Sequence, residues 1–419
     1  MEAFLQLVWQ QRLWEDLRPV GVLEGCEVEI LDVGLCNSNA GPDFFEAKVR
    51  IDDITWVGAV EIHARASEWL QHQHHLDPAY AGVVLHVVEE YDTPILGYNG
   101  HELPTLVMKV PQELRQRAEY LLQHATLLPC APLGERLSPR LIEEHLETLL
   151  SERLSAKAEA VHRLAEQYGW HEALYITVMR YFGSELNNDA MEQLARALPY
   201  RLLIRYADSP CRFEALLLGV SGLLASVPEG EYRSVLENEY RYLAHKHELS
   251  TLRLGWRQAR TRPASFPLRR LLQASALLRK SSFTPTTYAS CDSPEAMRLA
   301  LSPLPLSDYW QALYAEGERN LGLGLSRETI DSLAINIILP YTLAHAEASG
   351  TRGRILPRLV GLLSKLPAER NKITRLFARA GVPLRHAGDG QAVIQAYKTY
   401  CSRRKCIYCP WGRRLLAMR

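Results

Sequence analysis

The sequence lacks an excess of charge of either sign, because its 48 Lys and Arg residues equal its 48 Asp and Glu residues. A chain without net positive charge has no overall attraction for polyanions, so any nucleic-acid surface has to be a local patch. The sequence also lacks an apolar run of about 18 residues, which is the length that suggests a transmembrane helix. We therefore expect no membrane partner.

The N-terminus lacks the basic residues with which a secretory signal begins. Its first nine residues carry Glu2 and no Lys or Arg, so the sequence predicts a cytoplasmic protein. In that compartment the eight cysteines are expected to be reduced thiols or metal ligands. The chain also lacks internal repeats, and its 419 residues suffice for roughly two or three domains.

Strand patterns are confined to the first part of the chain. An amphipathic helix is predicted at residues 1–15, and a second helix at 67–77 with Ser67 as its N-cap. This order of elements predicts an α/β domain at residues 1–115 with a mixed sheet flanked by helices. The predicted strands have alternating or β-branched sequences and span residues 26–34, 43–51, 56–63, 83–88 and 103–110.

After residue 115 the pattern changes to apolar residues three and four positions apart, which is typical of helices. The clearest example runs from Leu137 to Tyr168. We therefore expect a large all-α domain at residues 116–419 that ends in a cysteine-rich tail. Further helices are predicted at 171–182, 189–207, 212–224, 230–247, 268–281, 292–301, 326–347, 355–365, 368–380 and 389–402.

Acidic and basic side chains meet in the first predicted hairpin, around the turn Asp52-Asp53. Asp43 opens one strand, and Glu61 and His63 lie two residues apart in the next, so that both point to the same face. Such carboxylates can hold Mg²⁺ or Mn²⁺, which neutralises charge on phosphate and activates water. His63 would then orient or activate the water. The alternative is a hairpin with a solvated polar face.

Two other residues of the Asp43 strand bear on this site. Glu46 can replace Asp43 as a ligand, or it is an exposed strand carboxylate beside Lys48. Lys48 lies on the strand next to Glu61, so it is a candidate for stabilising the charge that develops on a phosphate.

Histidines concentrate in the same part of the chain. The sequence contains 14 histidines, and five of them are His63, His72, His74, His75 and His86. We expect His72 and His74 to contact phosphate or metal, with a polar helix surface as the alternative. His86 lies within a predicted strand, where it is either a hydrogen-bonded core residue or a ligand.

A second candidate metal site lies in the C-terminal tail. Cys401, Cys406 and Cys409 have the spacing C-x4-C-x2-C, which suits one soft metal centre, either zinc or an iron–sulfur cluster. Three reduced thiols at a helix end are the alternative. Cys130 is the first candidate for the fourth ligand, and the others are Cys211, Cys291 and His386.

The same tail is locally basic. Tyr408 and Trp411 are interleaved with its cations, a composition that suits contact with a phosphate backbone and stacking on bases. A solvated basic tail is the other interpretation. The cations are Arg403, Arg404, Lys405, Arg413, Arg414 and Arg419.

Several motifs together resemble the uncharacterised bacterial domain-of-unknown-function family 2851 over nearly the whole chain. They are Asn39-x-Gly-Pro-Asp-Phe, Gly58-Ala-Val-Glu-Ile-His, Trp69-x-x-His-x-His, Val84-Leu-His-Val-Val, Arg262-Pro-x-x-Phe-Pro and the terminal cysteine run.

The N-terminal core alone is similar to the PD-(D/E)-x-K nucleases, with His63 in place of the usual lysine. That resemblance implies a restriction-endonuclease-like fold and metal-dependent hydrolysis of DNA or RNA. Two alternatives stay open. One is a non-catalytic scaffold or nucleic-acid-binding protein on the same fold, and the other is a metal-dependent enzyme that acts on a small molecule.

Overall fold

A computed structural model describes residues 2–37, 41–123, 128, 130–131, 138–257, 265–315 and 323–417. The chain forms two compact units. The first comprises Met1–His145, Arg379–Val382 and Ala396–Arg419, and the second comprises Leu146–Ala378 and Pro383–Gln395. This division differs from the predicted boundary at residue 115, because the first unit continues to His145 and also includes the C-terminal segment. Asn39 and Arg262, two residues of the motifs, lie outside the described residues.

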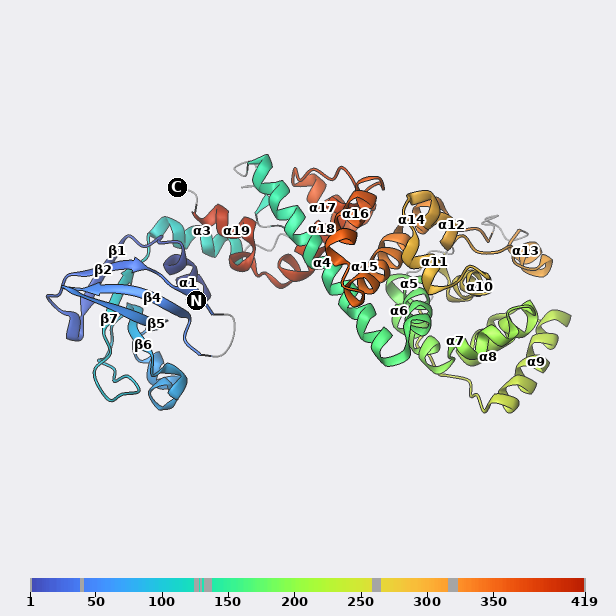
Figure 1. Cartoon of the computed structure of the whole chain (residues 1–419), viewed down its shortest axis with the longest axis horizontal. Helices are drawn as coiled ribbons and strands as arrows, with labels where there is room; N and C mark the ends of the chain where they lie inside the picture. The colour runs from blue at the N-terminus through green and yellow to red at the C-terminus, as the bar shows by residue number, and fades with distance from the viewer. Residues whose placement is uncertain are drawn as a thin grey trace. The chain divides into compact units, whose positions relative to one another are not determined.

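The first unit is built on a mixed sheet, which the sequence predicted (Figure 1). The strand order is β1-β7-β6-β5-β4-β2, and β3 pairs with β4. β5, β6 and β7 are parallel to one another, whereas the other pairs are antiparallel. The strands are β1 (Asp16–Val20), β2 (Val28–Asp32), β3 (Leu35–Cys36), β4 (Phe44–Ile51), β5 (Ile54–Arg65), β6 (Val83–Glu90) and β7 (Thr105–Lys109).

Strand β1 was not predicted. It contains Pro19, which cannot donate to a ladder and is therefore confined to sheet edges. β1 pairs only with β7 in the strand order, so Pro19 lies at such an edge. The predicted turn at Asp52-Asp53 is confirmed, since Ile51 pairs with Ile54 across it.

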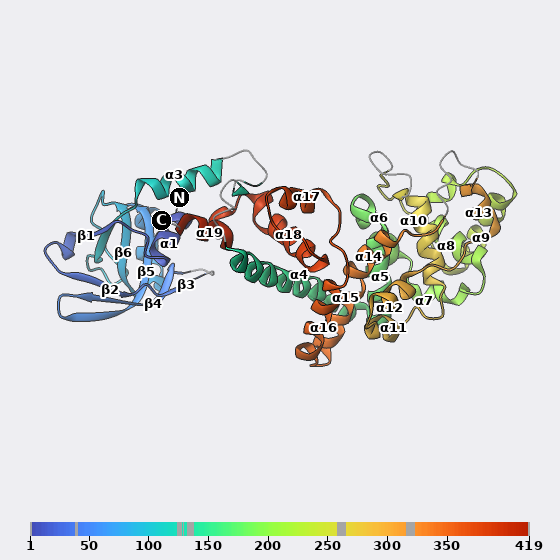
Figure 2. The same cartoon turned by 90° about the horizontal axis from the view of Figure 1, so that it is seen from above.

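Alternation along β5 sorts its side chains between two environments. Val60 and Ile62 are fully buried in a hydrophobic cluster with α1 (Glu2–Gln10), α3 (Gln112–Gln123) and α19 (Pro410–Ala417). Figure 2 shows these three helices beside the sheet. Glu61 and His63 alternate with these two residues and, as period two requires, point to the opposite face of β5.

The second unit is helical, as predicted. Pro340 has no N–H for the carbonyl of Asn336, and the predicted helix at 326–347 is correspondingly two helices that meet at Ile337. Within the described residues, no helix combines the length and the hydropathy that a membrane crossing requires. The helices of this unit, some of which extend into the first, are α4 (Pro139–Tyr168), α5 (Trp170–Phe182), α6 (Ser184–Ala197), α7 (Tyr200–Leu203), α8 (Pro210–Ser221), α9 (Glu231–His247), α10 (Pro267–Leu278), α11 (Pro285–Ser290), α12 (Pro294–Leu301), α13 (Asp308–Ala315), α14 (Arg327–Asn336), α15 (Ile338–Ala348), α16 (Arg352–Ser364), α17 (Lys372–Arg379) and α18 (Ala387–Thr399).

Candidate functional site

The candidate site lies where β5 leads into the crossover to β6. That crossover contains the helix α2 (Glu68–Gln71) and the 3₁₀ turns η2 (His74–Leu76) and η3 (Pro78–Tyr80). The predicted N-cap at Ser67 is wrong, because Ser67 has helical dihedral angles and its side chain makes no capping bond. The Glu68 carboxylate instead accepts the backbone N–H of Ala64.

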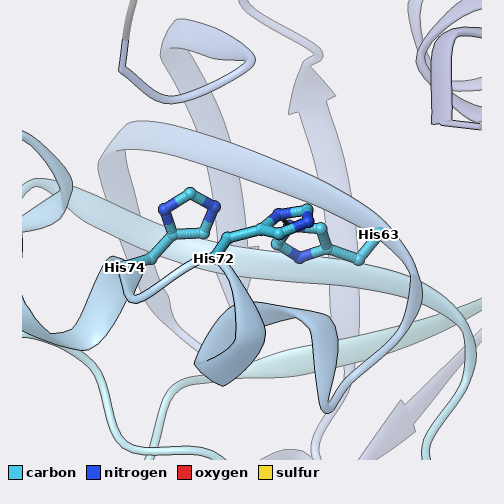
Figure 3. A group of neighbouring side chains, drawn as sticks. All are labelled: His63, His72 and His74. Carbon is cyan, nitrogen blue, oxygen red and sulfur yellow. Dashed lines mark hydrogen bonds between the residues drawn. The ribbon is translucent and has the colours of Figure 1, made fainter.

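The predicted helix at 67–77 is interrupted after one turn. α2 ends at Gln71 with His72 as its C-cap, and Gln73 has a left-handed backbone with φ +61°. This reversal brings His74 back toward the sheet. As a result, His72 and His74 face one centre together with His63, as Figure 3 shows.

These three histidines form a compact set of potential ligands. One ring nitrogen from each of His63, His72 and His74 lies within 4.8 Å of the other two. One of these contacts joins His63 Nε2 and His72 Nδ1 at 3.2 Å. His63 and His74 are buried, whereas His72 is exposed. The set is therefore open to solvent on the side of His72.

A buried carboxylate completes this set. Glu61 Oε1 lies 3.4 Å from His74 Nε2 and 3.7 Å from His63 Nε2, and Glu61 is only 5% exposed. Glu2, from helix α1, places its Oε1 3.8 Å from His63 Nε2. Imidazoles and carboxylates thus converge from a strand, a crossover turn and a helix.

His86 holds His63 from the other side of its ring. His63 Nδ1 lies 2.8 Å from His86 Nε2, and both residues are fully buried. Burial and the neighbouring histidines lower the pKa of His63 to about 2, and burial lowers that of His86 to about 3. Both rings are therefore neutral at pH 7. When His63 Nδ1 carries the shared proton, its Nε2 lone pair faces Glu61 and His72.

Asp43 and Glu61 are linked by hydrogen bonds between side chains and backbone N–H groups. The N–H of Asp43 donates to Glu61 Oε2 at 2.9 Å, and Asp43 Oδ2 accepts the N–H of Ile62 at 3.0 Å. The amide of Gln6 donates to Asp43 Oδ1 at 2.7 Å. Burial, and then the charge of Glu61, raise the pKa of Asp43 to about 7. The carboxylate of Glu61 is thus close enough to oppose the ionisation of Asp43.

Aromatic side chains of the crossover pack against the histidines of the site. The ring of Tyr80 stacks on His74 with centroids 3.8 Å apart. Trp69 is fully buried, packs against His74 and His86, and donates its indole N–H to the carbonyl of Leu96 at 3.1 Å. These contacts fix the ring of His74 while leaving its Nε2 toward Glu61.

The structure separates two of the predicted residues from this centre. Glu46 is exposed at an irregularity of β4, with φ +57°. Lys48 pairs with Val57, four residues before Glu61 on β5, which corresponds to about 13 Å along a strand. Lys48 is therefore poorly placed to stabilise charge at Glu61.

Sequence reasoning missed two residues of helix α1. Glu2 and Gln6 are four positions apart, so both lie on one face of the helix. Their contacts with His63 and Asp43 join segments that are far apart in sequence. The available signal was the polar side of a helix whose large apolar residues are all buried.

A cavity lies beside β4 and β5, and among the described residues its lining includes neither Asp43 nor Glu61. Its volume is about 680 Å³, and its lining residue Asn37 donates its backbone N–H to the carbonyl of Asp43 at 2.8 Å. Ala59, also in the lining, precedes Glu61 by two residues on β5. The full lining is Leu35, Cys36, Asn37, Phe45, Glu46, Val57, Gly58, Ala59, Ala79 and Gly82.

The predicted cysteine site lies in the first unit. Cys130 and the three tail cysteines interact electrostatically with one another, whereas Cys211, Cys291 and His386 belong to the second unit. The tail does not offer the predicted pair of stacking aromatics. Tyr408 is exposed, but Trp411 is buried against the ring of His145. Arg419 lies outside the described residues.

Comparison with known proteins places the chain in a family without assigning an activity. No curated protein and no solved structure matches it. A family model described as a protein of unknown function, DUF2851, matches residues 2–372. That match includes Asp43, Glu61 and every histidine of the candidate site. The chain therefore belongs to the DUF2851 family of proteins of unknown function.

Proposed function

We propose that the cluster of His63, His72, His74 and Glu61 binds a divalent metal ion and supports hydrolysis of phosphodiester bonds in DNA or RNA. The observation that carries this proposal is the convergence of three imidazoles, mutually within 4.8 Å, on a buried carboxylate that is coupled to Asp43. Buried ionisable groups in such a cluster are characteristic of metal and catalytic sites.

The donor set favours a transition metal. Mg²⁺ prefers oxygen ligands, whereas imidazole suits zinc, iron, nickel and copper. Of the two ions expected from the sequence, Mn²⁺ fits a mixed set of imidazoles and carboxylates better than Mg²⁺. Zn²⁺ and Fe²⁺ fit as well. His63, His74 and Glu61 would hold the ion from the protein side, and His72 would complete the set at the solvent side.

The charge of the site makes a metal necessary for this function. The carboxylates whose charges reach Asp43 are Glu61 and Glu2, so the metal-free centre repels phosphate. A bound cation would polarise the phosphoryl group and lower the pKa of water. The protein itself would contribute an oriented His63, the adjoining carboxylates of Glu61 and Asp43, and His72 at the solvent side of the set.

The topology is compatible with the restriction-endonuclease-like fold. Asp43 immediately precedes β4, Glu61 lies on the antiparallel neighbour β5, and a helical crossover then leads to the parallel strand β6. PD-(D/E)-x-K nucleases have this arrangement of acids. His63 occupies the position of their lysine, and its burial suits a metal ligand rather than a mobile cation.

A metal-dependent enzyme for a small molecule is the second candidate. One observation favours it: among the residues that the structure describes, those that line the cavity include Glu46 but neither lysine nor arginine. A groove for a nucleic-acid backbone normally carries several cations. The third candidate is a non-catalytic scaffold. In that case the histidine cluster only stabilises the crossover between β5 and β6.

The test is metal loading followed by cleavage. The full chain is stripped with a chelator, reloaded separately with Mn²⁺, Zn²⁺, Fe²⁺ or Mg²⁺, and incubated with single- and double-stranded DNA and RNA. We expect one transition-metal ion per cluster, cleavage that depends on it, and loss of both in Glu61→Gln. Glu29→Gln is the matched control, because Glu29 is an exposed strand carboxylate paired with Arg50.

The outcomes separate the three candidates. Metal binding with hydrolysis of a small phosphodiester, but of no nucleic acid, would favour the small-molecule enzyme. If the reloaded protein retains no metal at this cluster, the proposal is wrong and the scaffold remains. Cleavage that persists unchanged in Glu61→Gln would show that the activity resides elsewhere or in a contaminant.

A further inference from the structure

The C-terminal segment joins the core of the sheet unit through its cysteines. It consists of the 3₁₀ turns η8 (Cys401–Arg403) and η9 (Cys406–Tyr408), followed by helix α19. Cys406 belongs to the same hydrophobic cluster as the sheet and helix α1, and Cys130 packs against that cluster. Packing alone therefore brings a cysteine from the region after α3 to those of the tail.

All four cysteines of this group are free thiols. Cys406 and Cys409 are each 8% exposed, and Cys130 and Cys401 are partly buried. Each of Cys130 and Cys401 has its pKa raised first by burial and then by the other thiols of the group. The four thiols thus lie close enough to interact electrostatically with one another.

The backbone around Cys409 directs two N–H groups at its sulfur. Burial raises the pKa of Cys409, and the N–H groups of Trp411 and Gly412, which donate to its sulfur, offset part of that rise. Gly412 also permits a close approach of two backbone segments, since a Cβ there would lie 2.1 Å from the carbonyl oxygen of Cys406. The turn that carries Cys406 and Cys409 therefore packs closely against the start of helix α19.

The spacing of the sulfurs distinguishes between two kinds of metal centre. Four thiolates on one zinc ion, each about 2.3 Å from it, lie about 3.8 Å apart in a tetrahedron. Among the described residues, no three of these sulfurs come within 4.8 Å of one another, whereas the histidine cluster does. In an iron–sulfur cluster the cysteines bind different iron atoms, so their sulfurs are farther apart.

We propose that Cys130, Cys401, Cys406 and Cys409 bind an iron–sulfur cluster. Its position in the chain gives it a structural consequence. Every residue of the second unit lies between Cys130 and Cys401 in the sequence, so the cluster covalently joins the two ends of the sheet unit across that insertion. This site is independent of the histidine cluster and does not rest on the function proposed there.

The experiment is anaerobic purification of the full chain, followed by a visible absorption spectrum and assays of iron, acid-labile sulfide and zinc. We expect iron and sulfide in equal molar amounts and a broad visible absorption. Cys401→Ser and Cys130→Ser should each lose most of the iron. Cys211→Ser, a partly buried cysteine of helix α8, should retain it.

If the serine variants fail to fold, a measurement on the wild-type protein still tests the proposal. Removal of iron by a chelator after oxidation should bleach the absorption and lower the midpoint of thermal unfolding. One zinc per chain without sulfide would overturn the cluster in favour of a mononuclear site. Protein that contains neither metal after anaerobic purification and anaerobic reconstitution with iron and sulfide would also overturn it.

Discussion

His63 and His86 form a buried pair across the parallel strands β5 and β6, with His63 Nδ1 2.8 Å from His86 Nε2. A metal ligand of this type normally donates its second ring N–H to a neighbouring acceptor, which fixes both its tautomer and its orientation. His86 supplies that acceptor to His63. The pair therefore prepares His63 Nε2 to bind a metal without contributing a ligand of its own.

Replacing His86 should accordingly weaken metal binding without removing a ligand. His86→Leu removes the acceptor, and we expect the affinity of the cluster for Zn²⁺ or Mn²⁺ to fall by about 10- to 100-fold. His86→Gln keeps a carbonyl oxygen that can accept from His63 Nδ1, so it should retain more of the affinity. Titration calorimetry on chelator-treated protein measures both. Equal affinities of the leucine and glutamine variants would contradict the positioning role.

The pKa of Asp43 predicts how stability depends on pH in the metal-free protein. Its pKa rises from 3.8 to about 7 on folding, so between these values the folded state binds more protons than the unfolded chain. Stability from this group therefore falls as the pH rises. Asp43→Asn removes the effect, and wild type should lose up to about 1.4 kcal/mol per pH unit relative to the variant.

The other titratable groups contribute equally to the stability of wild type and Asp43→Asn, so their effects cancel in the difference. The pKa of His63 falls from 6.5 to about 2 on folding, so it stabilises both proteins increasingly as the pH rises through that window. Urea unfolding of wild type and Asp43→Asn at several pH values between 4 and 7, in the presence of a chelator, gives the difference. Parallel curves would show that Asp43 is not perturbed. Added metal should flatten the wild-type curve.

Much of the sheet followed from local patterns. Alternation placed Glu61 and His63 on one face, and the turn at Asp52-Asp53 set the register of β4 and β5. The helical periodicity after residue 115 was equally local, and the structure has helices there. These features depend on neighbours in the sequence, which is why one sequence sufficed.

The rest of the candidate site arises from contacts that are distant in sequence. Glu2 and Gln6 reach His63 and Asp43 only because helix α1 packs on the sheet. The left-handed conformation of Gln73 has no signal in residue type, since glycine or asparagine is the usual choice there. Without it, His74 would lie on a helix surface.

Replacing Trp69 should lower the free energy of unfolding even when the new side chain is also aromatic. Trp69→Phe leaves the carbonyl of Leu96 without its 3.1 Å indole donor and opens space beside His74. Because Trp69 has no exposed surface, the space left in the core should cost about 1–3 kcal/mol. Trp56→Phe is the control, because Trp56 on the same sheet is 49% exposed and should change the free energy of unfolding by less than about 0.5 kcal/mol. Equal losses in urea unfolding would refute the assignment.

A glycine pair tests how closely β5 approaches the segment before β6. A Cβ at Gly58 would lie 2.4 Å from Val84 Cγ1 and 2.7 Å from the carbonyl oxygen of Gly82, whereas a Cβ at Gly82 meets nothing within 4 Å. Since the backbone oxygen of Gly82 cannot rotate away, the strands must separate to admit a methyl group at Gly58. We expect Gly58→Ala to lower the free energy of unfolding by about 1–3 kcal/mol. Gly82→Ala should leave it nearly unchanged.

Because Gly58 precedes Glu61 by three residues on β5, the strain should also lower metal affinity in Gly58→Ala but not in Gly82→Ala. A destabilised Gly58→Ala with unchanged metal affinity would place the strain outside the site.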